Sequence, residues 1–255
     1  PTATSRPATL EARFLAVIAR TEEGLPAPAP QSAEEVARLA SHTAFLAGDL
    51  RQVFAAWQSG PWEPEGPLEL AMIAEALADS GQPSALDMIA KLRPYQPAEA
   101  DAILARYLWS QGRFKECYDA CAAAMGRYRI DPWPLSNLMA RFFAVLGDLP
   151  ARDPQLAPLV FELFTPALPL DLLDDERNLM RLLAARYLGS SRELEALEPL
   201  EPNFPWRRDL LDERARVYEE LKHPRAATAR RELEAFDRHE PTAFAKGLEV
   251  PVPAP

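Results

Sequence analysis

The sequence predicts an all-α fold built from antiparallel helix pairs, and three observations support this prediction. Amphipathic segments with helical periodicity recur along the chain and are separated by short turns. The 255 residues include only 10 glycines but 26 prolines, which disfavours a barrel or sandwich with many tight turns and suits helices bounded by prolines. The turn residues also recur at intervals of 31 to 44 residues, which is typical of a repeat architecture.

Composition and charge exclude several classes of function. Hydrophobic residues make up 48% of the chain and charged residues 26%, as in ordinary folded proteins. The formal net charge of −10 makes a nucleic-acid backbone a poor partner. We find no apolar run long enough for a membrane-spanning helix. The sequence leaves the compartment open, with a soluble, cytoplasmic protein slightly favoured.

The chain begins with a region, residues 1–31, that we expect to lie outside the repeats. Residues 10–21 carry an apolar stripe and predict a first helix, and residues 24–31 form a proline-rich connector. Ser32 then precedes Glu35 by three residues, the capping-box pattern that marks the start of a helix. The repeats are therefore predicted to begin at residue 32.

Six predicted turns align the repeats that follow. They are Gly48, Gly81, Gly112, Gly147, Ser191 and Lys222, at spacings of 33, 31, 35, 44 and 31 residues. The residue seven positions before each turn is always small. These residues are Ser41, Ala74, Ala105, Ala140, Ala184 and Ala215. Paired helices need small residues where their axes approach closely, because interiors are tightly packed.

The fourth repeat is predicted to be irregular. Asp153 is an expected N-cap with Pro154 in the first helical turn, followed by a helix over residues 155–164. Prolines flank aromatic residues in segments 60–67 and 201–206, which we expect to be loops packed between repeats. A polar final helix over 225–238 is expected to cap the array, and residues 239–255 form a proline-rich tail.

The clearest repeat covers residues 97–125, where two amphipathic segments meet at Gly112. Cys117 and Cys121 are four apart on its second helix, so we expect both in the helix seam rather than in a metal site. This stretch resembles a tetratricopeptide repeat, a helix–turn–helix unit of about 34 residues. The resemblance covers residues 32–238 and implies a right-handed superhelical array of about 11–13 helices. A general α-solenoid and a bundle of seven to twelve helices remain alternatives.

No catalytic constellation is recognisable in the sequence. The phosphate-binding, dinucleotide-binding, serine-hydrolase and zinc-protease motifs are all absent. His223 and His239 have no neighbouring nucleophile, and the acidic run before residue 177 suits a helix N-terminus better than a metal site. We therefore expect no catalytic residues, no metal and no cofactor.

The resemblance instead implies a concave groove lined by the first helix of each repeat, which binds a peptide or helix of a partner. The groove would include Arg38, His42, Phe45, Glu75, Arg106, Trp109, Asn137, Arg141 and Arg181. Arg106, Asn137 and Arg141 would bind a carboxylate or phosphate on the partner. Trp109 would supply an aromatic anchor. The alternative is a solvated helix face with Trp109 half-buried between repeats.

Three functional hypotheses follow. The first is a non-catalytic scaffold that binds a protein or peptide segment in the groove. The second is an accessory or regulatory repeat domain carried on a larger enzyme or a membrane-associated protein. The third is a helical enzyme with its active site in the groove. The sequence identifies neither the partner nor the oligomeric state.

Overall fold

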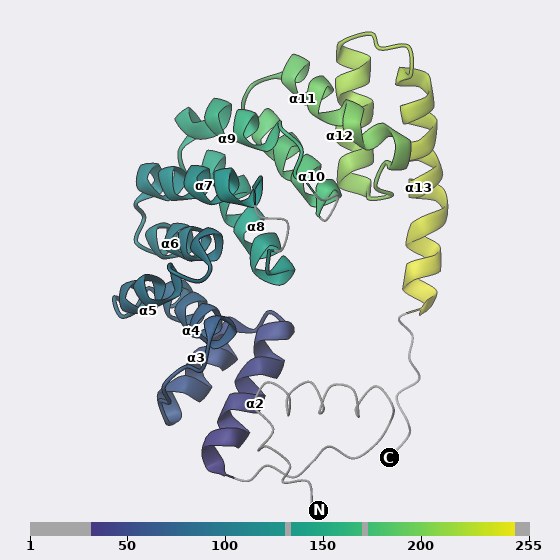
Figure 1. Cartoon of the computed structure of the whole chain (residues 1–255). Coiled ribbons are helices and arrows are strands. Elements are labelled where there is room, and N and C mark those ends of the chain that lie inside the picture. Colours follow the sequence, from purple (N-terminus) through teal and green to yellow (C-terminus); the bar gives the residue numbers. More distant parts are fainter. Residues whose placement is uncertain (1–31, 131–133, 170–172, 248–255) are drawn as a thin grey trace, which may run out of the picture. The chain divides into compact units, whose positions relative to one another are not determined.

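The computed structural model describes residues 32–130, 134–169 and 173–247. These residues form twelve α-helices and two short 3-10 helices, with no β-strand among them (Figure 1). The predicted all-α class is confirmed, whereas the superhelical arrangement and its hand stay predictions. The expected N-terminal helix and its connector lie outside the described residues. No helix in the described ranges combines the length and apolarity needed to cross a bilayer.

The chain divides into two compact units, residues 1–142 and 143–255. The described helices of the first unit are α2 (Ala33–Leu46), α3 (Leu50–Ser59), α4 (Pro67–Asp79), α5 (Ala85–Leu92), α6 (Pro97–Ser110) and α7 (Phe114–Tyr128), followed by the beginning of α8 (Ser136–Arg152). Helices α2 and α3, α4 and α5, and α6 and α7 pair as hairpins, and α4 also packs on α3 and α6. The first unit is thus a series of helix hairpins, as predicted.

The first three predicted turns are confirmed and share one geometry. Gly48, Gly81 and Gly112 all have positive φ, at 78°, 67° and 71°. The residue after each glycine donates its backbone N–H to a carbonyl five residues earlier, for example Arg113 to Leu108 at 2.9 Å. This is the Schellman ending of a helix, in which glycine adopts the left-handed conformation without a steric cost.

Small residues lie in the helix seams of this unit as predicted. Ser41, Ala74 and Ala105 are completely buried. Cys117 and Cys121 are also fully buried on α7, and burial raises the pKa of the Cys121 thiol well above its ordinary value. These cysteines act as small apolar residues in the core.

The loop between α3 and α4 is packed, as its proline-flanked tryptophan predicted. Trp62 is buried, and its ring centroid lies 6.2 Å from that of Trp57 at the end of α3. Pro67 then occupies the first turn of α4, where its missing N–H costs no helical hydrogen bond. The loop therefore fills the space beside its helix pair.

The second unit contains the rest of α8 and seven further described helical segments. They are η1 (Pro154–Leu156), α9 (Ala157–Phe164), α10 (Asp174–Ala185), α11 (Ser190–Leu197), η2 (Glu198–Asn203), α12 (Arg208–Glu220) and α13 (Ala226–Gly247). Helix α10 packs on α9 and α11, and α12 packs on α11 and α13. The Asp153 cap is confirmed, because its carboxylate accepts the Gln155 N–H at 3.1 Å.

Two predicted turns are wrong. Gly147 lies inside α8, which continues through Pro150 to Arg152. A Cβ atom at Gly147 would lie 2.5 Å from the sulfur of Met180, so this glycine permits the close approach of α8 and α10. Ser191 lies within α11, and the turn before that helix is formed by Gly189, whose φ is 94°.

The misplaced turn at Gly147 also explains the one exception among the six small residues. Ala140, counted back from that turn, is only half-buried. Ala184 and Ala215 are buried as expected. The final predicted turn is confirmed at Lys222, which has a φ of 53°. Helix α13 then continues to Gly247, beyond the expected boundary at residue 238.

We predict opposite effects of leucine at two helical glycines. Gly147→Leu should lower the free energy of unfolding by about 1–3 kcal/mol, because the new side chain overpacks the contact with Met180. Gly126→Leu in α7 is the matched control, since no atom lies within 4 Å of a Cβ there. That variant should gain up to about 1 kcal/mol from helix propensity. If urea unfolding gave the same change in the free energy of unfolding for Gly147→Leu and Gly126→Leu, the close approach of α8 and α10 at Gly147 would be contradicted.

Candidate functional site

A surface pocket of about 390 Å³ is the place in the first unit where predicted site residues gather. Four separate parts of the sequence line it. The lining residues are Ala47, Gly48, Asp49, Leu50, Arg51, Asp79, Arg106 and Arg141. They come from the α2–α3 turn, the end of α4, the last half of α6 and the first half of α8. The pocket therefore depends on the packing of successive helix hairpins.

The turn at Gly48 forms one side of the pocket. Its left-handed conformation ends α2 and allows Asp49 to cap α3, where the Asp49 carboxylate accepts the Gln52 N–H at 3.0 Å. Arg51 follows in the first turn of α3 and is exposed. In the described part of the chain its guanidinium makes no hydrogen bond or ion pair, so it is available to a ligand.

A buried carboxylate beneath the pocket fixes the other two arginines. Glu75 is only 1% exposed. Arg141 binds it with two parallel bonds, of 2.8 Å from Nε and 2.5 Å from Nη2. The Nε atom of Arg106 lies 3.4 Å from the same carboxylate. Two-pronged pairing of this kind fixes both the position and the orientation of a guanidinium.

Arg106 and Arg141 also make further contacts. Arg106 donates from Nη1 to Asp79 at 2.6 Å and from Nη2 to the backbone carbonyl of Arg141 at 3.3 Å. The Arg141 guanidinium lies over the ring of Phe45, 4.8 Å from the centroid. Both arginines are thus already paired within the chain and do not form an open anion clamp.

The arginines of the pocket differ in how far they are exposed and paired. Their side chains are 14% exposed at Arg106 and 18% at Arg141, so the edges of both guanidinium groups reach the surface. Arg51 adds the one guanidinium of the lining that has no partner among the described residues. The lining includes no histidine, cysteine or hydroxyl side chain, and no group of three metal-binding side chains occurs in the described ranges.

Arg38 and His42, also predicted for the groove, form a separate buried cluster around Glu69. His42 Nε2 lies 3.0 Å from one Glu69 oxygen, and Arg38 Nη2 lies 3.4 Å from the other. Arg38 also donates to Glu65 at 2.8 Å. All three central side chains are at most 5% exposed. This cluster ties α2 to α4 and is part of the core.

The remaining predicted residues lie elsewhere. Trp109 is half-buried, with its ring edge-on to that of Phe114 in the same hairpin at 5.4 Å. Asn137 is exposed on α8 and does not line the pocket. Arg181 belongs to the second unit, where its guanidinium lies 4.3 Å from the centre of the Phe161 ring and pairs with Glu195.

Sequence analysis missed Asp49, Arg51 and Asp79 as pocket residues. Two sequence signals point to the aspartates, and none points to Arg51. Asp49 directly follows the turn glycine Gly48, and Asp79 precedes Gly81 by two residues. Acidic side chains beside a helix-ending glycine lie at the rim of the hairpin, where a neighbouring helix can supply a partner.

We predict that the Glu69 cluster makes the stability of the first unit depend on pH. Burial alone would raise the pKa of Glu69, but hydrogen bonds from His42 and from the Glu65 backbone, with the charge of Arg38, hold this pKa below its ordinary value of 4.5. The stabilisation is therefore present above about pH 4.5 and is lost as the pH falls through the lowered pKa.

The test compares urea unfolding of the wild type and Glu69→Gln between pH 7 and pH 3. The variant should be less stable by about 1.5–3 kcal/mol at neutral pH, the usual contribution of a hydrogen bond to a charged group. The difference should shrink below pH 4.5. Asp87→Asn, at an exposed position of α5, should show no such convergence. A difference between wild type and Glu69→Gln that stays constant with pH would disprove the predicted linkage.

Comparison with known proteins adds no relative from which a function could be transferred. No protein-family model, no curated protein and no solved structure matches this chain. The tetratricopeptide resemblance therefore stays a prediction that rests on the sequence pattern. The geometry of the pocket is the basis for the function considered next.

Proposed function

We propose that this chain is a non-catalytic scaffold that binds a segment of a partner protein at the pocket around Arg51, Arg106 and Arg141. One observation carries the proposal. The exposed guanidinium of Arg51 has no partner in the described part of the chain, and it lines the same pocket as two guanidinium groups held in place by Glu75. The guanidinium of Arg51 suits a carboxylate on the partner, and the two ordered arginines fix the shape of the pocket beside it.

The cost of binding is reduced by the way the arginines are held. Arg141 and Arg106 are already ordered by Glu75 and Asp79, so a partner carboxylate does not have to immobilise them. Leu46, next to the pocket in sequence at the end of α2, is 51% exposed and offers an apolar contact. The favoured partner segment therefore combines an acidic side chain with an apolar neighbour.

The same proposal includes stacking of the helix pairs as a right-handed, tetratricopeptide-like array. Its support is the repetition of one turn geometry at Gly48, Gly81 and Gly112, with a small buried residue seven positions before each. Repeats of this kind complete their cores by packing on their neighbours. Sites formed by several successive repeats, such as this pocket, follow from that arrangement.

Arg51→Glu is the variant that tests the proposed site most cleanly. Arg51 is exposed in the first turn of α3, where glutamate suits the helix N-terminus, so the fold should be unaffected. Replacing Arg106 and Arg141 would instead leave Glu75 buried without its partners and would destabilise the unit.

The measurement is quantitative mass spectrometry of proteins captured on the immobilised chain. A specific partner should be recovered at least about tenfold less on Arg51→Glu, which corresponds to about 1.4 kcal/mol. Lys115→Glu, an exposed charge reversal on α7 outside the pocket, should retain the partner. Circular dichroism should be the same for all three proteins. Equal recovery by wild type and Arg51→Glu would remove the pocket from the proposed function.

A further inference from the structure

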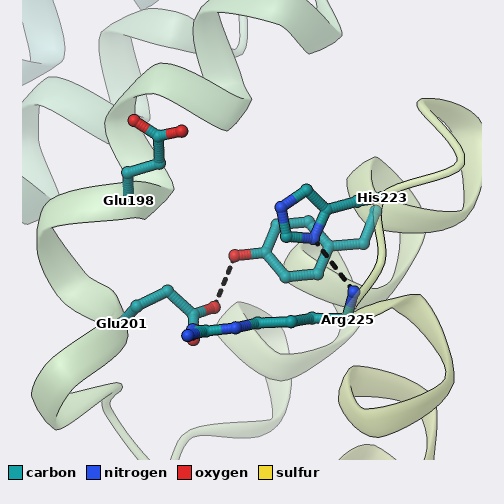
Figure 2. A pocket seen from close by; sticks show the side chains of 5 residues that line it. Glu198, Glu201, His223 and Arg225 are labelled. Atoms are coloured by element: carbon teal, nitrogen blue, oxygen red, sulfur yellow. Dashed lines mark hydrogen bonds and ion pairs between the residues drawn. The ribbon is translucent and has the colours of Figure 1, made fainter.

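The second unit contains a hollow of about 480 Å³ that the proposed scaffold function does not use. It lies between the 3-10 segment η2, the end of α12 and the turn that leads to α13 (Figure 2). Its lining residues are Glu198, Glu201, Tyr218, His223 and Arg225. Two carboxylates, two aromatic rings and one guanidinium therefore surround it.

A stack of two aromatic rings forms one wall of the hollow. Tyr218 is almost fully buried and donates its hydroxyl to Glu201. Burial and the charge of Glu201 raise the pKa of Tyr218 far above its ordinary value, so the phenol stays a neutral donor. The His223 ring lies over it, with centroids 4.1 Å apart and an angle of 37° between the planes.

The backbone fixes the tautomer of neutral His223. The N–H of Arg225 is 3.2 Å from Nδ1 of the imidazole, and Figure 2 shows this contact as a dashed line. Because a backbone nitrogen can only donate, Nδ1 must be the acceptor, and the proton of the neutral ring is on Nε2. The ring is thus held both by stacking and by a hydrogen bond.

The two carboxylates of the hollow differ in their partners. Glu201 accepts bonds from Tyr218 and from Arg225 Nη1, the latter at 2.6 Å. Glu198 is exposed, lies on the η2 side of the hollow in Figure 2, and makes no hydrogen bond or ion pair with any described residue. The formal charges of the lining residues Glu198, Glu201 and Arg225 sum to −1.

The unit already binds guanidinium groups in this manner beside the hollow. Arg214, whose side chain is 5% exposed, lies over the Phe204 ring at 4.1 Å and 3.7 Å from Glu201. Arg225 is paired with the other oxygen of Glu201. In both cases a carboxylate holds the charge, and at Arg214 an aromatic ring also contacts its flat face. Glu198 and the His223 ring line the same hollow, and Glu198 has no partner among the described residues.

We infer that this hollow binds an arginine side chain of a basic partner segment. Glu198 pairs with the guanidinium, and the half-buried His223 ring stacks on its plane. The net charge of −10 on the chain favours approach of a basic segment. This site involves only residues of the second unit and is independent of the pocket at Arg51.

The test is a titration of the full chain with N-acetyl-arginine amide at constant ionic strength, followed by NMR of the imidazole signals. With only three histidines in the chain, the His223 signal can be assigned by substitution. It should shift in a saturable way, while the signal of buried His42 stays constant. Glu198→Gln should weaken binding about tenfold, as expected for loss of a charge-assisted pair.

Glu234→Gln removes an equal charge from an exposed position of α13 outside the hollow, and it should leave the affinity unchanged. Inorganic phosphate, titrated separately, should not compete with the arginine amide. Three results would each overturn the inference: no saturable shift at His223, equal affinity in Glu198→Gln and wild type, or displacement of the arginine amide by phosphate. None of these outcomes bears on Arg51, so failure here leaves the proposed scaffold function standing.

Discussion

Pairing of buried carboxylates with arginines from neighbouring helices is the interaction on which both units depend. Among the described residues, at least five helical carboxylates with side chains at most 6% exposed have an ion pair to an arginine. They are Glu69, Glu75, Asp101, Glu193 and Glu213. An unpaired buried charge would be strongly destabilising. The positions of neighbouring helices are therefore constrained by charge as well as by apolar packing.

Three polar contacts between helices share one sequence separation. His42 and Glu69, Asp79 and Arg106, and Arg186 and Glu213 are each 27 residues apart. Each of these contacts joins the first helix of one hairpin, or its C-cap residue, to the first helix of the next hairpin within the same unit. Small residues in the seams bring the helices close, and the polar pairs determine how the helices are aligned along their axes.

Sequence reasoning predicted the features that are determined locally. Helical periodicity gave the all-α class, and left-handed glycines at Gly48, Gly81 and Gly112 gave the first three turns. It failed at Gly147, because a glycine that permits close packing against Met180 has the same appearance in sequence as one that ends a helix. Only the partner helix distinguishes the two roles.

The candidate site was predictable only in part, for a related reason. Alignment of the repeats on their predicted turns placed Arg106 and Arg141 on the same surface, and both line the pocket. It could not show that Glu75, 66 residues before Arg141, already holds that guanidinium. The periodicity of a helix gives the face on which a side chain lies, whereas its partner depends on packing between distant helices. Arg51 and Glu198 have no partner among the described residues, and this could be recognised only from the structure.

These observations suggest a division of roles among the charged residues. Buried pairs such as Glu75 with Arg141 connect helices within a unit, and Arg51 and Glu198, which have no partner among the described residues, line surface pockets. Arg51 in the first turn of α3 and Glu198 in η2 are opposite in sign. The two units would accordingly select partner groups of opposite charge, an acidic group at Arg51 and a basic group at Glu198.

A double-mutant cycle on Glu75 and Arg141 tests the central claim most directly. The free energies of unfolding of Glu75→Gln, Arg141→Gln and the double variant would be measured by urea denaturation. Each single variant should lose about 3–5 kcal/mol, since it leaves one buried charge without its main partner. The double variant should lose at least about 1 kcal/mol less than the sum of the two. Additivity within about 0.5 kcal/mol would show that the pair does not couple the helices.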